Sequence, residues 1–398
     1  MRKYFQYLTV CFLLVTACSD KDRKQQEDDI LKIDTIQTRF PQIDSLVISN
    51  APEDLEKAKK IEELVQKEYN RRAFNGTVLV VNKGKVIYAS AKGKANFNTQ
   101  TDLTIHSSFH LASVSKQFTA MAIMMLKEQG KLDYDDDITK YLSEIPYKGI
   151  TIRNLLNHTS GLPNILNYVP HYLSYWDSCK IARNADLPYI LQTTKPRIQY
   201  HPNQRFSYNN TGYVLLAVLV ETIAQMPYEE FIEKNIFKPL NMTNSCVYNI
   251  TDESKLTNRA YGYTTYRGRY VLNEDDIRNG FVGEKGIYSS VVDLYKWDRA
   301  LNTELLVSKE TLEEAFSYST VKNGRKINYG FGWRKSKKEE QIVYHFGHWR
   351  AFNSLLLKFT KDDNTIILLN NTGSRRIKKI ARDIINVLYE NEKEVPEF

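Results

Sequence analysis

Cysteine is scarce in this sequence, with four residues in 398. Cys11 and Cys18 fall in an N-terminal segment with the features of an export signal, which leaves Cys179 and Cys246 for the rest of the chain. The body of the protein can therefore hold one disulfide bond at most. Two separate buried thiols fit the sequence equally well.

Motifs for metal binding and for one common hydrolase site are also missing. The seven histidines show no His-Glu-x-x-His spacing, and no Gly-x-Ser-x-Gly occurs. Asp133, Asp135, Asp137 and Glu144 match ligand positions of a calcium loop, but Ile138 stands where the sharp turn needs glycine. The sequence therefore predicts no metal site and no cofactor, and it argues against an α/β-hydrolase nucleophile elbow.

A concentrated positive charge is lacking too. The chain has 55 Lys and Arg residues against 47 Asp and Glu, a net charge of +8 that is spread along its length. Nucleic-acid binding needs a basic face, so we expect no nucleic-acid partner. With 26% charged and 42% hydrophobic residues, the composition is that of an ordinary globular protein that buries one large core or two intergrown subdomains.

The N-terminus has the pattern of an export signal. Arg2 and Lys3 precede an apolar run that is too short to span a membrane. It ends in Val15-Thr16-Ala17-Cys18, which resembles a bacterial lipobox, where small residues precede a lipidated cysteine. We expect a lipoprotein anchored through Cys18 to a cell-envelope membrane, with its body outside the cytoplasm. A plain signal peptide with an unrelated cysteine is the alternative.

Four segments follow along the chain. They are a lipoprotein signal peptide, a lipidated cysteine with a flexible polar tether, a folded domain and a short tail. Their expected bounds are residues 1–17, 18–51, 52–390 and 391–398.

Runs of β-branched and apolar residues lie near both ends of the folded segment. Residues 76–81 and 85–91 flank Asn82-Lys83-Gly84, which indicates a hairpin. Further strands are expected at residues 329–334, 341–345, 354–359 and 365–370, and the sequence between the two blocks is mostly helical and irregular. This order predicts an α+β fold in which an antiparallel sheet, built from both ends of the chain, is flanked by helices and interrupted by a helical subdomain.

Amphipathic helices are expected at residues 52–72 and 374–389. The first has its apolar residues at Leu55, Ala58, Ile61, Val65 and Tyr69, and the second at Ile377, Ile380, Ile384 and Leu388. Either helix could lie on a membrane surface, but packing on the sheet explains both patterns and is the interpretation adopted.

Ser113-Val114-Ser115-Lys116 is the stretch that suggests chemistry. The apolar, helix-forming run from Gln117 to a stop at Gly130 places Ser113 in the first turn of a helix. Residues three apart share a helix face, so the Lys116 amine can point at the Ser113 hydroxyl and act as its base. Ser-x-x-Lys is common by chance, so this interpretation depends on partners elsewhere in the chain.

Tyr208 and Asn210 form a first candidate partner, a Tyr-x-Asn motif that precedes an apolar helical run. A tyrosine near a lysine ammonium is expected to have a lowered pKa and could relay a proton. Asn210 could bind a substrate amide or fix Lys116.

His345-Phe346-Gly347 is a second candidate, at the end of a predicted strand. Gly347 allows close approach of the backbone, and the amide of His348 could serve as an oxyanion donor beside that of Ser113. His345 could present a cation or a hydrogen-bond donor to a substrate carboxylate, although a single strand histidine is more often structural.

Taken in this order, the three motifs resemble those of the serine β-lactamase and penicillin-binding protein family, closest to its class C and D,D-peptidase-like branch. The similarity runs from about Pro52 to about Tyr389. It includes His158-Thr159-Ser160-Gly161-Leu162-Pro163, Lys238-Pro239-Leu240-Asn241-Met242, Tyr329-Gly330-Phe331-Gly332-Trp333 and the segment with Gly283, Gly286, Ser289, Ser290, Asp293 and Leu294.

The resemblance implies a β-lactamase/transpeptidase-like fold and a serine hydrolase in which Ser113 is acylated and water or another acceptor then releases the acyl group. Lys116 and Tyr208 would manage the proton, and the sequence does not decide which of them is the base. The substrate would be a small molecule or peptide: a D-amino-acid peptide, an ester or a β-lactam. The alternative is a catalytically silent lipoprotein that keeps the pocket for binding or sensing.

Two departures from the family pattern bear on the substrate. His345-Phe346-Gly347 stands where class C enzymes carry Lys-Thr-Gly, and Ala351 stands where a glycine is expected. A histidine in this place looks more like D,D-carboxypeptidase, D-amino-acid peptidase or esterase relatives than an efficient β-lactamase. A tyrosine-rich stretch from Tyr168 to Trp176 would edge the cleft or pack beside it.

Overall fold

The structure is a computed structural model that describes residues 46–164, 181–250, 253–273, 277–392 and 394–398. The predicted signal peptide, Cys18 and nearly all of the predicted tether lie outside these residues. So do the tyrosine-rich stretch from Tyr168 to Trp176 and Cys179. Cys246 is a buried free cysteine.

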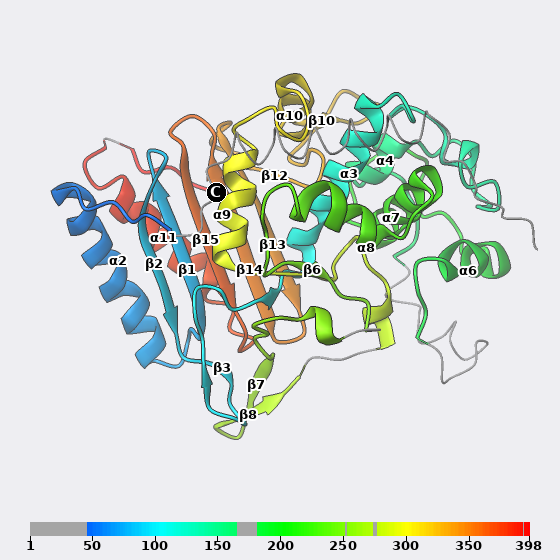
Figure 1. Ribbon diagram of the computed structural model, residues 1–398. Coiled ribbons are helices and arrows are strands. Elements are labelled where there is room, and N and C mark those ends of the chain that lie inside the picture. Colours follow the sequence, from blue (N-terminus) through cyan, green and yellow to red (C-terminus); the bar gives the residue numbers. More distant parts are fainter. Residues whose placement is uncertain (1–45, 165–180, 251–252, 274–276, 393) are drawn as a thin grey trace, which may run out of the picture. The chain divides into compact units, whose positions relative to one another are not determined.

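A mixed arrangement of helices around an antiparallel sheet confirms the predicted fold class (Figure 1). Within the described residues the main sheet has six strands in the order β12-β13-β14-β15-β1-β2. They are β1 (Gly76–Asn82), β2 (Lys85–Lys92), β12 (Arg334–Lys335), β13 (Ile342–Trp349), β14 (Phe352–Phe359) and β15 (Asn364–Asn370). β1 pairs antiparallel with β15, from Gly76 opposite Asn370 to Val81 opposite Thr365, so both ends of the chain build one sheet, as predicted.

One predicted strand, at residues 329–334, is wrong. Only Arg334 and Lys335 join the sheet, and the residues before them form a tight turn in which the N–H of Gly330 donates to the carbonyl of Trp333 (2.9 Å). Gly332 has a φ of +77°, in the left-handed region, which interrupts an extended run.

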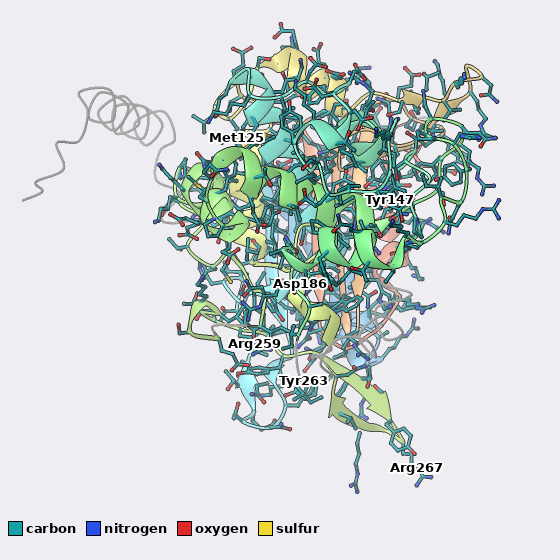
Figure 2. The ribbon with its side chains drawn as sticks, turned by 90° about the vertical axis from the view of Figure 1, so that its right-hand side faces the viewer. Met125, Tyr147, Asp186, Arg259, Tyr263 and Arg267 are labelled. Atoms are coloured by element: carbon teal, nitrogen blue, oxygen red, sulfur yellow. The ribbon has the colours of Figure 1, made fainter. Side chains whose placement is uncertain are left out.

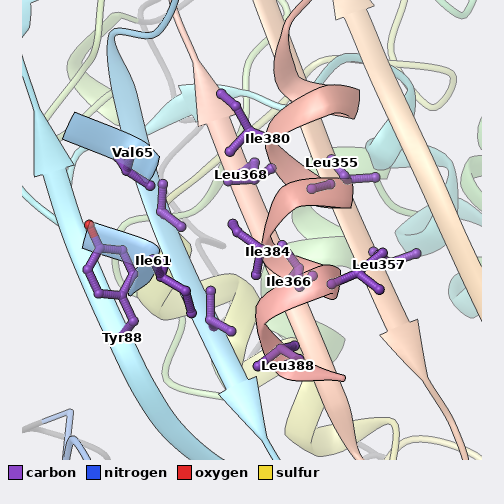
Figure 3. Packing of buried hydrophobic residues seen from close by; sticks show 14 of the residues in the cluster. Ile61, Val65, Tyr88, Leu355, Leu357, Ile366, Leu368, Ile380, Ile384 and Leu388 are labelled. Carbon is purple, nitrogen blue, oxygen red and sulfur yellow. The ribbon is translucent and has the colours of Figure 1, made fainter. Parts of the chain in front are cut away.

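The helices α2 (Pro52–Asn70) and α11 (Ile377–Leu388) cover one face of the sheet (Figure 1). Figure 3 shows their apolar side chains meeting those of the strands. The predicted apolar residues of α11 are all buried there, which confirms packing on the sheet. The prediction for α2 holds at its centre, where Ile61 and Val65 are fully buried, whereas Leu55 and Tyr69 remain 51% and 37% exposed near its ends.

The helix α9 (Val291–Ala300) packs against β1 and β15. Its Asp298 makes a buried ion pair with Lys358 of β14 (2.9 Å), and the Trp297 indole donates to the side chain of Gln117 (3.0 Å). These contacts connect the sheet to α3 (Lys116–Glu128), which also packs on α7 (Asn210–Ala224) and α8 (Tyr228–Ile232). The remaining α-helices of the described part are α4 (Ile152–Leu156), α6 (Asp186–Thr194) and α10 (Lys309–Ala315).

Short strands complete the described structure. β5 (Phe109–His110), β9 (Ile287–Ser289) and β6 (Cys246–Val247) form a small sheet in the order β5-β9-β6. The other pairs are β3 (Lys94–Asn96) with β4 (Thr101–Asp102), β7 (Tyr263–Tyr266) with β8 (Arg269–Leu272), and β10 (Ser319–Thr320) with β11 (Lys326–Ile327). The β7–β8 hairpin carries Arg267 at its turn (Figure 2). No helix in the described part of the chain has both the length and the apolar character that a membrane span needs.

Candidate active site

The predicted nucleophile lies between β5 and α3, in a 3-10 turn over Ala112–Ser115. Lys116 begins α3, so Ser113 stands just before the α-helix and not in its first turn, where the sequence placed it. Ser113 is partly exposed, whereas both its neighbours and Lys116 are buried. The hydroxyl of Ser113 is therefore reachable while the backbone that carries it is held in the core.

Two glycines let other segments press against this turn. A Cβ atom on Gly347 would lie 2.1 Å from the carbonyl oxygen of Leu111, and one on Gly332 would lie 2.7 Å from that of Lys116. Ala112 has a φ of +49°, which strains a residue with a side chain. The segments around Gly332 and Gly347 thus fix the nucleophile turn from two sides.

The Lys116 side chain reaches three oxygen atoms. Its Nζ lies 2.9 Å from Oδ1 of Asn210, 2.8 Å from the carbonyl oxygen of Glu284 and 3.2 Å from Oγ of Ser113. The first two oxygens can only accept, and a neutral amine has two N–H groups to donate to them. Its lone pair is then left for the hydroxyl hydrogen of Ser113, which is the arrangement of a base beside a nucleophile.

Burial lowers the pKa of Lys116 from 10.5 to about 7, because the fully buried amine loses the hydration of its charged form. Glu284 opposes the change and Arg334 adds to it. A large fraction of the amine is therefore neutral near neutral pH, as a base requires.

Tyr208 lies beside Lys116, whose Nζ is 5.0 Å from the centre of the tyrosine ring. Burial raises the pKa of Tyr208 above its ordinary value, and hydrogen bonding with Ser113 and the charge of Arg334 only partly offset this. The sequence-based expectation of a lowered tyrosine pKa is thus wrong, because desolvation outweighs the nearby cations. The buried hydroxyl makes no hydrogen bond of normal length and angle within the described residues, and it remains protonated and able to donate.

Tyr208 lies against His158, which the sequence marked only as part of a run that resembles the family. The two rings lie 4.3 Å apart, and Nδ1 of His158 accepts the backbone N–H of Asn209 (3.2 Å). Asn209 in turn caps α7 by accepting the N–H of Thr211 (2.7 Å), which sets Asn210 at the start of the helix, against Lys116. His158 is a positioning residue, and its adjacency to Tyr208 has no signature in the sequence.

The structure contradicts the cationic role that the sequence predicted for His345. His345 is 1% exposed, and burial lowers its pKa well below the usual range, with Arg334 and Lys116 acting in the same direction. Its Nδ1 lies 2.8 Å from the carbonyl oxygen of Phe346, which can only accept, so Nδ1 carries the hydrogen. Nε2 is then free to accept the hydroxyl of Tyr329 (2.9 Å). A neutral histidine with both nitrogens engaged inside the protein does not hold a substrate carboxylate.

Gly347 and His348 follow on β13. Gly347 lies against Leu111, as described above, while the His348 side chain is exposed, with Nδ1 3.0 Å from Oδ1 of Asn353. The oxyanion role assigned to the backbone amide of His348 remains a prediction.

Two charged residues that the sequence did not single out complete the site. Glu284 is buried, pairs with Lys285 (2.8 Å) and offers its backbone carbonyl to Lys116. Arg334 places its guanidinium carbon 5.1 Å from the centre of the Tyr208 ring. Arg334 directly follows the family-like run that ends at Trp333, which is the one sequence signal for it. In the described residues no three His, Cys, Asp or Glu side chains are grouped to hold a metal ion.

Comparisons with known proteins identify the family of the chain. The family model described as beta-lactamase matches residues 58–387. Penicillin-binding protein 4* of Bacillus subtilis (strain 168) is 35% identical over 355 residues, which cover 86% of this chain and 78% of the relative.

Solved structures show the same relationship. The octameric penicillin-binding protein homologue from Pyrococcus abyssi superposes with a TM-score of 0.73 at 26% identity, over 85% of this chain and 79% of that one. The D-amino acid amidase from Ochrobactrum anthropi SV3 has a TM-score of 0.68 over 85% of this chain and 100% of that one; at 19% identity this shows a shared fold alone. With the sequence match spanning most of its length, the chain belongs to the β-lactamase family of serine hydrolases.

Proposed function

We propose that this protein hydrolyses acyl compounds through an acyl-enzyme formed at Ser113. The observation that carries the proposal is the placement of Lys116, whose Nζ lies 3.2 Å from the Ser113 hydroxyl while Asn210 and the Glu284 carbonyl occupy its two N–H groups. The lowered pKa of Lys116, about 7, supports lysine as the base in the choice between Lys116 and Tyr208 that the sequence leaves open.

In the first half-reaction Lys116 removes the hydroxyl proton of Ser113 as the oxygen attacks the substrate carbonyl. The backbone amides of Ser113 and His348 would stabilise the oxyanion. Tyr208, which stays protonated, gives its proton to the leaving group and regains one through Lys116. In the second half-reaction water attacks the acyl-enzyme, its proton is taken up by the same groups, and the acid product leaves with Ser113 restored.

D-amino-acid peptides or amides, esters and β-lactams are the substrates we propose. Support comes from the names of the penicillin-binding relatives and of the D-amino acid amidase that shares the fold. The lipobox-like Val15-Thr16-Ala17-Cys18 supports a place in the cell envelope, with a lipid anchor on Cys18.

Covalent labelling tests the proposal. A fluorescent penicillin and a fluorescent fluorophosphonate should attach to the protein and fail to attach to Ser113→Ala. Ser317→Ala, which removes an exposed hydroxyl after α10, is the matched control and should label fully. Equal labelling of Ser113→Ala and the unmodified protein by both reagents would overturn the proposal.

A further inference from the structure

His110 is a buried histidine that the proposed mechanism does not use. It is the last residue of β5 and pairs with Tyr288 of β9, and Leu111 alone separates it from the nucleophile turn. Its ring packs edge-on against that of Tyr288, with the centres 5.0 Å apart, and stacks on that of Phe352 at 5.8 Å. Strand pairing and ring contacts together fix the direction in which the imidazole points.

The imidazole of His110 points at the backbone of the nucleophile turn, where Nδ1 accepts the N–H of Ala112 (2.9 Å). A ring nitrogen that accepts carries no hydrogen, so the ring is neutral and has its hydrogen on Nε2. Burial lowers the pKa of His110 to about 3, and the charges of Lys285 and Arg259 act in the same direction. Nδ1 therefore remains an acceptor at every pH at which Lys116 can serve as a base.

The peptide group between Leu111 and Ala112 is held at both ends. Its N–H donates to His110, and its oxygen, the Leu111 carbonyl, accepts the hydroxyl of Ser354 in β14 (2.5 Å). These bonds keep Ala112 at a φ of +49°. Such a conformation is unfavourable for a residue with a side chain and persists only where the surroundings enforce it. Without the bond to His110, this peptide could rotate and return Ala112 to an ordinary negative φ.

Ser113 follows Ala112 directly, so the conformation of Ala112 sets the direction of the Ser113 amide and side chain. In the proposed mechanism that amide stabilises the oxyanion, and the hydroxyl lies 3.2 Å from Nζ of Lys116. We propose that His110 is a positioning residue which, through the N–H of Ala112, holds Ser113 in the geometry that acylation needs. The inference rests on the proposed function and adds a residue to it. What the site requires of His110 is a hydrogen-bond acceptor at the place of Nδ1, and neither a base nor a charge.

Two substitutions separate this hydrogen bond from the packing of the ring. His110→Asn keeps an acceptor, because Oδ1 of asparagine is bonded to Cγ as Nδ1 of histidine is, but it loses most of the ring contacts. His110→Leu keeps an apolar side chain for those contacts and loses the acceptor. A positioning role predicts that the asparagine variant is acylated faster than the leucine variant. A role in packing alone predicts the reverse order.

The rate constant of acylation is obtained from the burst of p-nitrophenol released from p-nitrophenyl acetate, at about pH 9, where Lys116 is neutral. We expect His110→Leu to lower this rate constant by about 10- to 100-fold without weakening binding of the ester, because small displacements of a reacting group have effects of this size. His110→Asn should keep most of the rate. His110→Gln, whose acceptor lies one carbon further out, should behave like the leucine variant and replaces it if that variant does not fold.

Thermal unfolding of each variant, together with a control, shows whether lost stability alone lowers the rate. Ile384→Ala removes a fully buried side chain between α11 and the sheet, so it should lower stability while the rate constant of acylation stays unchanged.

A leucine variant that is acylated as fast as the unmodified protein would overturn the inference and show that Ser354 alone holds the peptide. An asparagine variant no faster than the leucine variant would overturn it as well. Both results leave the proposed function standing. If the unmodified protein gives no Ser113-dependent burst, the proposed function is overturned and the inference with it.

Discussion

The pKa of Lys116 makes a quantitative prediction about the pH dependence of acylation. Its decrease from 10.5 to about 7 corresponds to roughly 5 kcal/mol and raises the neutral fraction at pH 7 from roughly 0.03% to about half. A protonated amine cannot accept the Ser113 proton. The rate should therefore rise about tenfold per pH unit below pH 7 and level off above it.

Two substitutions should move this midpoint in opposite directions. Arg334→Gln removes a positive charge that disfavours the ammonium form, so it raises the pKa of Lys116 and moves the midpoint to higher pH. Glu284→Gln removes a negative charge that favours the ammonium form, so the midpoint moves to lower pH. We expect shifts on the order of one unit, with Lys335→Gln unchanged as a control.

The assay is the burst of p-nitrophenol from p-nitrophenyl acetate, a neutral ester. Thermal unfolding of each variant shows whether it is folded, which matters most for Glu284→Gln because Lys285 loses its buried partner. A midpoint near 10, or shifts of the same sign in the two variants, would refute Lys116 as the base.

Four further predictions concern other parts of the molecule. Tyr208→Phe should lower kcat by about 10²- to 10⁴-fold while thermal unfolding is unchanged, because only a proton donor is lost. Gly347→Ala should lower both activity and stability, since its Cβ would lie 2.1 Å from the backbone before the nucleophile. Lys358→Met removes one of the two cations that pair with the buried Asp298 and leaves the other, Arg299, so it should reduce the free energy of unfolding by about 1.5–3 kcal/mol in urea titrations. Cys18→Ser should move the protein from the membrane fraction to the soluble fraction of the producing cells and abolish incorporation of labelled fatty acid.

Each of these four predictions can be contradicted by a specific result. Full activity of the tyrosine variant would assign the leaving-group proton to another donor, and a fully active glycine variant would show that the nucleophile turn tolerates displacement. An unchanged unfolding free energy would mean that Arg299 alone compensates the charge of the buried aspartate. Fatty-acid labelling that persists in the cysteine variant would place the anchor elsewhere.

Periodic patterns in the sequence were enough to predict most of the sheet and its terminal helix. The β-branched runs of β1 and β15 and the isoleucine spacing of α11 each report burial directly. The strand expected at residues 329–334 failed because Gly332 adopts a left-handed conformation that packs a turn on Lys116. That constraint comes from the tertiary structure and leaves no periodic trace.

For the candidate site too, some features could be predicted from the sequence and others could not. Ser113 and Lys116 could be paired from their spacing, and Tyr208 and His345 from the family resemblance. Their protonation could not be predicted, because burial decides it: desolvation keeps Tyr208 protonated and His345 neutral against the simple expectation from neighbouring charges. Arg334 reaches Tyr208 through the pairing of β12 with β13, which no local pattern encodes.

The pairing of β1 with β15 also determines when the molecule can fold. Asn75, just before β1, makes a buried hydrogen bond to Asn371, a residue 296 positions later in the chain. Synthesis delivers the nucleophile turn early and the strand that completes the centre of the sheet almost last. Contacts between residues so far apart in the sequence form slowly, so the apolar strands of the first half of the chain stay exposed until then. Folding is therefore committed only after nearly the whole chain has been made, and a chain that ends before Asn364 would retain Ser113, Lys116 and Tyr208 but have no complete sheet to hold them.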